Sequence, residues 1–125
     1  MKNLKLNYFY RDASNYKTPG YELIFAGPIS PIEMREIQMT CEDEQYFIPE
    51  AVGLPDSRLQ FEESGAPVYE EQDDHVFNEI FDDGLELVTE EPNQEMTAQE
   101  LLARFREVRS NGGWNSLAAM ESRGW

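Results

Sequence analysis

Apolar and polar residues alternate at the start of the chain and again after a polar loop. The first predicted strand covers 4–10 and places four apolar side chains on one face: Leu4, Leu6, Tyr8 and Tyr10. A loop over 11–20 contains the turn signal Pro19-Gly20, and 21–26 reads as a second strand. The two strands predict an antiparallel hairpin with a long tip.

Two segments carry the pattern of a capped helix. Ser30 and Glu33 form a capping box that opens a helix running to about Cys41. Thr97 and Glu100 form a second box. The helix that follows has an apolar stripe at Leu101, Leu102, Phe105 and Val108. Asn111-Gly112 ends it. The remaining residues to Trp125 allow one or two further helical turns.

The middle of the chain predicts strands separated by a loop. Residues 45–48 suit a short strand, and 49–68 read as a loop with a helical turn near 50–52. From 76 to 89 a strand pattern returns around Asp83-Gly84, a dipeptide typical of a two-residue hairpin turn. That hairpin would point two side chains to the core and four to the outer face. The inward pair is Ile80 and Leu87, and the outward set is Glu79, Phe81, Glu86 and Val88.

These elements predict an α+β fold. We expect a small antiparallel sheet, built from the N-terminal hairpin and a second hairpin around Asp83-Gly84, packed against two or three helices. At 125 residues the chain suits a single domain over 1–125. Residues 113–125 are expected to act either as a C-terminal latch or as an interface.

Charge divides the chain unevenly. Residues 42–95, the acidic region, hold 18 Asp and Glu against one base, Arg58, for a net charge of −17. The other 71 residues hold 7 acids and 9 bases, so the whole chain carries −15. Confinement to one region argues against halophilic adaptation, which should spread acid over the whole surface. Core-forming residues interleave with the acids, so the region belongs to the fold.

This charge sets the kind of partner to expect. Direct binding of nucleic acid needs a basic footprint, which the chain lacks. No segment approaches the length of a membrane span, and an acidic surface is repelled by anionic headgroups. The lone cysteine, Cys41, cannot form an internal disulfide and reads as a packing residue at a helix end. We expect a cytoplasmic protein with a basic protein partner and no cofactor.

The only histidine suggests a metal site as an alternative. His75 follows Asp73 and Asp74 and lies four residues before Glu79. Imidazole and carboxylate are suitable ligands for first-row divalent ions. In a strand, however, His75 and Glu79 would lie about 13 Å apart, which favours a histidine at a strand entrance.

Two further groups of residues are candidates for interaction. The hairpin loop offers stacking and hydrogen-bonding side chains: Tyr10, Arg11, Asp12, Asn15, Tyr16 and Lys17. Alternatively, Arg11 and Lys17 dock on the acidic region and hold the hairpin down. Trp114 and Trp125 are either a latch on the core or, if exposed, an interface for a homo-oligomer.

Three motifs together resemble an uncharacterised family of small acidic bacterial proteins. They are FYRDASNYK at 9–17, FIPEAVGLP at 47–55 and DDH at 73–75, and the likeness covers about residues 8–105. The resemblance implies a bacterial cytoplasmic protein and brings no activity with it. The extension from Gly112 to Trp125 is outside the pattern.

Three functions follow as hypotheses. The first is a non-enzymatic interaction module whose acidic region engages a basic protein surface, with Asp73, Asp74, Glu79 and Glu86 among the contacts. The second is a small metal-dependent hydrolase that uses His75 with nearby carboxylates. The third is a self-associating domain whose acidic face is merely solvated.

Overall fold

The computed structural model describes residues 2–64 and 74–125. Four strands form one antiparallel sheet in the order β2-β1-β4-β3. The strands are β1 (Asn3–Phe9), β2 (Tyr21–Phe25), β3 (Tyr46–Phe47) and β4 (Asn78–Val88). The helices are α1 (Pro31–Thr40), the 3₁₀ helix η1 (Pro49–Val52), α2 (Leu59–Glu63), α3 (Ala98–Ser110) and α4 (Ser116–Arg123). The predicted α+β class is confirmed.

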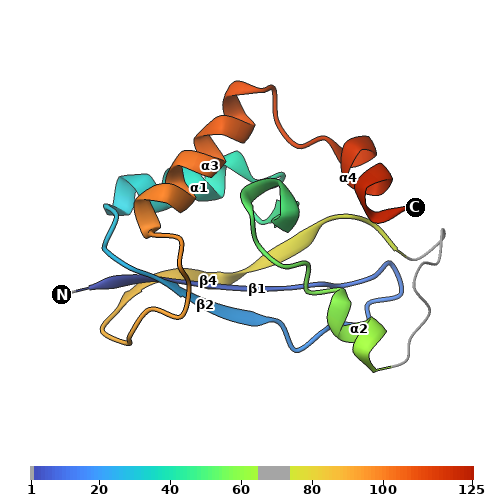
Figure 1. Cartoon of the computed structure of the whole chain (residues 1–125), viewed down its shortest axis with the longest axis horizontal. Coiled ribbons are helices and arrows are strands. Elements are labelled where there is room, and N and C mark those ends of the chain that lie inside the picture. The colour runs from blue at the N-terminus through green and yellow to red at the C-terminus, as the bar shows by residue number, and fades with distance from the viewer. Residues whose placement is uncertain (1, 65–73) are drawn as a thin grey trace.

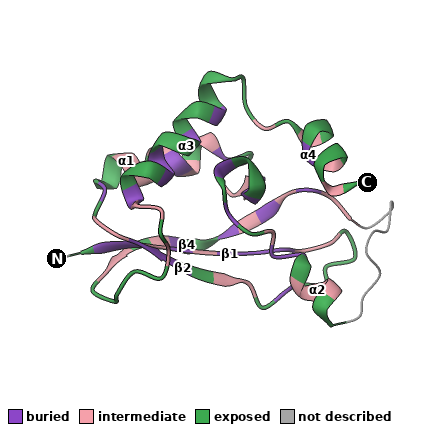
Figure 2. Cartoon of the chain, viewed as in Figure 1, coloured by how far each residue is buried: buried purple, intermediate pink, exposed green. Residues whose placement is uncertain are grey.

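One face of the sheet is covered by α1 and α3 (Figure 1). Their starts have the predicted geometry, because Ser30 and Thr97 each accept a hydrogen bond within a complete capping box. The core between these helices and the sheet contains the stripe of α3 and one face of β1. Figure 2 shows buried residues where α3 and the sheet face each other. The apolar periodicity therefore placed both layers correctly.

The predicted hairpin around Asp83-Gly84 is wrong. β4 runs without a turn through both residues and pairs with β1 on either side of them, from Leu85 to Val88 and at Glu79 and Ile80. The register shifts between Leu6 and Tyr8, whose partners are Leu85 and Ile80. The intervening residues of β4 are accommodated as a bulge. This pairing gives β1 a partner strand on each side, β2 and β4.

Gly84 shows why glycine occupies this bulge. A Cβ there would lie 2.6 Å from the Asn7 carbonyl oxygen and 2.7 Å from Cγ2 of Ile80. Glycine therefore permits a close approach between β4 and β1, where the sequence suggested a turn. Of the two predicted core residues, Ile80 is 3% exposed and Leu87 packs partly buried against the same core.

The loop predicted over 49–68 contains two short helices. One is η1, which matches the expected turn near 50–52, and the other is α2, which the sequence pattern missed. α2 has no side-chain cap and only five residues. Tertiary contacts hold it, including a hydrogen bond from the Gly20 N–H to Gln60 at 3.0 Å and an edge contact between Tyr10 and Phe61.

Candidate functional site

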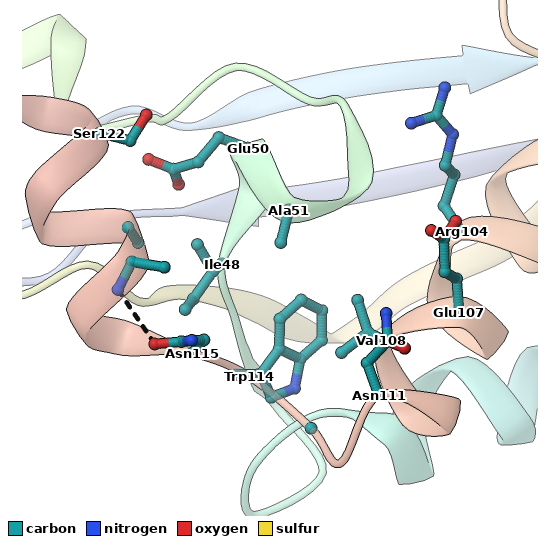
Figure 3. Close-up of a pocket in the computed structure, with 13 residues that line it drawn as sticks. Ile48, Glu50, Ala51, Arg104, Glu107, Val108, Asn111, Trp114, Asn115 and Ser122 are labelled. Atoms are coloured by element: carbon teal, nitrogen blue, oxygen red, sulfur yellow. Dashed lines mark hydrogen bonds between the residues drawn. The ribbon is translucent and has the colours of Figure 1, made fainter.

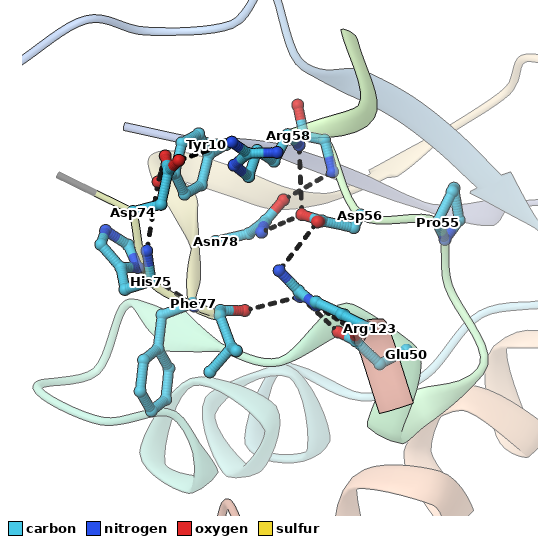
Figure 4. A network of polar contacts seen from close by, with 12 residues as sticks. Tyr10, Glu50, Pro55, Asp56, Arg58, Asp74, His75, Phe77, Asn78 and Arg123 are labelled. Atoms are coloured by element: carbon cyan, nitrogen blue, oxygen red, sulfur yellow. Dashed lines mark hydrogen bonds and ion pairs between the residues drawn. The ribbon is translucent and has the colours of Figure 1, made fainter. Parts of the chain in front are cut away.

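A buried arginine organises the polar groups at one end of the sheet (Figure 4). Arg58 is 2% exposed, and its guanidinium pairs with Asp74 at 2.5 Å and with Glu62 at 2.9 Å. Tyr10 is fully buried and donates its hydroxyl to Asp74 at 2.7 Å. Burial alone would lower the pKa of Arg58, but the hydrogen bond and charge of Asp74 raise it. The only base of the acidic region therefore neutralises acids inside the fold.

A second arginine ties the C-terminus to the same network. Arg123 pairs with Glu50 at 2.5 Å and with Asp56 at 2.9 Å, and it donates to the Val76 carbonyl. Burial raises the pKa of Asp56, while the charge of Arg123 opposes that rise. The Trp125 ring lies 5.1 Å from the guanidinium carbon of Arg58 and 4.8 Å from that of Arg123. These cation–π contacts dock the last residue on the network.

His75 is held as a structural residue at the entrance to β4. Its Nδ1 accepts a hydrogen bond from the Phe77 N–H at 3.1 Å, so the neutral ring carries its proton on Nε2. That Nε2 donates to the Arg11 carbonyl oxygen at 2.8 Å. Neither nitrogen is left as a lone-pair donor to a metal or as a base.

The other metal candidates are also engaged. Asp74 binds Arg58, Glu79 binds Arg11 at 3.1 Å, and Asp73 lies outside the described residues. Within residues 2–64 and 74–125, no group of three or more His, Cys, Asp or Glu side chains is placed to hold a metal ion. Cys41 is buried, and its pKa is raised to about 12 by desolvation. In the described part of the chain, His75, Asp74 and Glu79 are thus each engaged by other groups of the fold.

The hairpin loop is ordered by its own side chains. Asp12 accepts from the Tyr16 N–H at 2.9 Å, and Arg11 donates to the Asn15 side chain at 2.9 Å. Arg11 also docks on the acidic region through Glu79, as the structural alternative expected. Lys17 forms no ion pair with any residue that the structure describes. Tyr16 is 71% exposed, and Lys17 is exposed too, so both side chains are accessible on the loop.

Trp114 packs into a groove between α3, α4 and η1 (Figure 3). The ring contacts Phe47 and Phe105, and its N–H donates to the Thr40 carbonyl at 2.9 Å. The groove encloses about 440 Å³, and its charged side chains are Glu50, Arg104 and Glu107. Both tryptophans thus contact their own chain, which agrees with the latch. Self-association through them stays a prediction.

The described carboxylates of the acidic region fall into two sets. Seven form ion pairs with bases of the chain: Glu44, Glu50, Asp56, Glu62, Asp74, Glu79 and Glu90. Eight are exposed and form no ion pair with a described residue: Glu42, Asp43, Glu63, Asp82, Asp83, Glu86, Glu91 and Glu95. We call these eight the unpaired acids.

Five of the eight unpaired acids lie on β4 or next to its neighbour β3. Three belong to β4 itself, at Asp82, Asp83 and Glu86, and two lie in the loop that follows it. Two more precede β3, which pairs with the start of β4. Three acids lie apart: Glu63 at the end of α2, and Glu91 and Glu95, because the loop after β4 crosses to the opposite edge of the sheet, where Asn93 bonds to Ile24 of β2. Counting along the sequence identified the charged region, and the structure places five of its eight unpaired acids on β4 or next to β3.

Arg58, Asp56 and Arg123 are the residues that sequence reasoning missed. One signal could have found Arg58, because a single base among 18 acids is the natural centre of a buried ion-pair network. Arg123 gave no such signal, since its partners are more than 60 residues away along the chain.

Comparisons of the chain with protein-family models, with curated proteins and with solved structures found no match. No helix in the described part of the chain is both long and apolar enough to cross a membrane.

Proposed function

We propose that the protein is a non-enzymatic interaction module whose acidic region engages a basic protein surface. The observation that carries this proposal is the set of eight exposed, unpaired acids, five of which lie on β4 or next to β3. A cluster of like charges accelerates encounter with an oppositely charged partner and selects that partner by sign.

The division between the two sets of carboxylates supports this proposal. Acids that serve the fold form internal ion pairs, as Asp74 does with Arg58. Here more than half of the described acids are left in solvent, where they contribute little to stability. Their remaining physical effect is the field they project. His75, Asp74 and Glu79, by contrast, are already engaged by groups of the fold.

A capture experiment at two salt concentrations tests the proposal. The immobilised protein is incubated with bacterial lysate at about 0.1 M and about 1 M salt, where the Debye length falls from about 10 Å to about 3 Å. We expect a basic protein to be retained at low salt and released at high salt. The double variant Asp82→Asn and Asp83→Asn should retain less of it.

The matched control removes two charges elsewhere. Glu107 on α3 and Glu121 on α4 are exposed and form no ion pair with a described residue, so Glu107→Gln with Glu121→Gln changes the net charge equally. Retention by this control should match that of the wild type. The proposal fails if no basic protein is lost between the two salt concentrations, or if both double variants behave alike.

A further inference from the structure

One edge of the sheet is open along most of β4. β3 pairs only with Asn78 and Glu79, and one more hydrogen bond joins the Ile80 N–H to Gln45 at 2.8 Å. Beyond Ile80, no described segment pairs with the side of β4 that faces away from β1. The opposite edge is different, because the Asn93 main chain and side chain bond both the N–H and the C=O of Ile24 on β2.

The bonding of Ile24 fixes which groups of β4 face outward. Its N–H and C=O point away from β1, so Ile24 and its partner Lys5 form a non-hydrogen-bonded pair. Lys5 therefore directs its own N–H and C=O to β4, where it is opposite Glu86. The residues on either side of Glu86, Leu85 and Leu87, must then direct theirs to the open edge.

An independent contact agrees with this assignment. Leu85 and Leu87 are opposite Leu6 and Leu4 of β1, and Ile80 is opposite Tyr8. Tyr8 is an even number of residues from Leu4 and Leu6, so the main chain of Ile80 should point the same way as that of Leu85 and Leu87. The alternation of hydrogen-bonded and non-hydrogen-bonded pairs in an antiparallel sheet requires the Ile80 N–H to point away from β1, and that N–H bonds to the Gln45 carbonyl. No hydrogen bond from a described residue reaches the N–H or C=O of Leu85 or Leu87 at this edge.

Side chains along the open edge differ by face. Leu85 and Leu87 pack partly buried against the core, while Glu86 is exposed on the outer face. Asp82 and Asp83 stand at the bulge that ends the edge. Pairing with a second copy in the same register would bring acids together, and like charges on facing strands are destabilising. Charge thus disfavours self-pairing and favours a basic strand.

We propose that the edge of β4 from Leu85 to Val88 accepts an extended segment of a basic partner as a fifth strand. The segment would alternate apolar and basic residues. Apolar side chains would lie beside Leu85 and Leu87, and a Lys or Arg would face Glu86. This inference rests on the proposed function and names the form in which the basic partner binds.

A synthetic peptide tests the inference without altering the protein. The probe is acetylated, amidated Lys-Val-Lys-Val-Lys-Val-Lys, titrated into isotope-labelled protein and followed by NMR. Two derivatives carry N-methyl groups on every valine or on every lysine, which keeps the charge and removes one set of N–H donors. A strand that pairs antiparallel uses the donors opposite Leu85 and Leu87, on the valines, whereas a parallel strand uses those of the lysines.

We expect the unmodified peptide to bind and to slow amide hydrogen exchange at Leu85 and Leu87. One derivative should bind about tenfold more weakly than the unmodified peptide, and the other should bind as tightly as it does. Lost backbone hydrogen bonds of about 1 kcal/mol each would account for the tenfold change. Equal binding of all three peptides without protection of those amides would overturn the edge inference and leave the proposed function standing. No binding of any peptide at low salt would count against both.

Discussion

Arg58 supplies the positive charge that compensates the buried carboxylate of Asp74 in the acidic region. Its guanidinium is enclosed with Asp74, which is 7% exposed, and with Tyr10 and Trp125 nearby. A buried ion pair contributes modestly as a whole, but removing one partner leaves the other charge without compensation. Individual side chains thus divide into those that complete the fold and those that only charge its surface.

Replacing Arg58 with Ala should therefore be severe. We expect a loss of about 3–5 kcal/mol in the free energy of unfolding, because the Asp74 carboxylate would stay buried without its cation. Arg104→Ala is the control, since Arg104 is exposed and forms no ion pair with a described residue, and it should cost less than about 0.5 kcal/mol. Urea unfolding compares the two, and equal losses would contradict the assigned role.

Cys41 gives a prediction that depends on pH. Burial raises the pKa of its thiol to about 12, so at pH 8 only about one thiol in 10⁴ is ionised, against about a quarter for a free cysteine. Alkylation by iodoacetamide at pH 8 should be about a thousandfold slower in the native protein than in urea. Similar rates in both states would show that the thiol is accessible.

At the scale of elements, the sequence predicted those whose signal is local. The capping boxes at Ser30 and Thr97 and the alternation in β1 each contain their own evidence, and all were confirmed. The conformations of two other segments depend on partners that are distant in the sequence. α2 is held by contacts to Gly20 and Tyr10, and the Asp83-Gly84 dipeptide lies in a bulge because the residues on both sides of it pair with β1. The Arg58 network was missed for the same reason.

Substitutions at Gly84 can distinguish the observed bulge from the hairpin turn that the Asp83-Gly84 dipeptide suggested. In a two-residue hairpin turn, Asn could replace Gly because it tolerates a left-handed backbone. In the bulge, any Cβ at residue 84 meets the Asn7 carbonyl at 2.6 Å. Gly84→Ala and Gly84→Asn should each destabilise the protein by about 1–3 kcal/mol in thermal unfolding. Wild-type stability of Gly84→Asn would contradict the continuous strand.

Truncation after Asn111 tests the latch against self-association. It removes Trp114, Arg123 and Trp125, which together contact β3, η1 and the Arg58 network. If the segment is a latch, its removal should lower the melting temperature. The number of chains per particle, measured by sedimentation, should stay the same. A drop from dimer to monomer would support the interface instead.

At the scale of the whole molecule, the structure shows where the acidic residues of region 42–95 lie. The sequence showed 18 acids in 54 residues but could not say how they would be divided. Folding uses seven of the described ones in ion pairs and leaves eight exposed, five of them on β4 or just before β3. That division depends on which distant bases reach each acid, as Arg123 reaches Asp56 and Glu50.

The most direct measurement is to map where a simple polycation binds. Isotope-labelled protein is titrated with decalysine at about 0.05 M salt and again at about 0.5 M, with chemical shifts followed for every amide. We expect the changes to centre on Glu42, Asp43 and 82–86 and to be lost at the higher salt, as screening requires. Changes centred on α3 and α4, or spread evenly over all exposed acids, would contradict an interaction surface around β4.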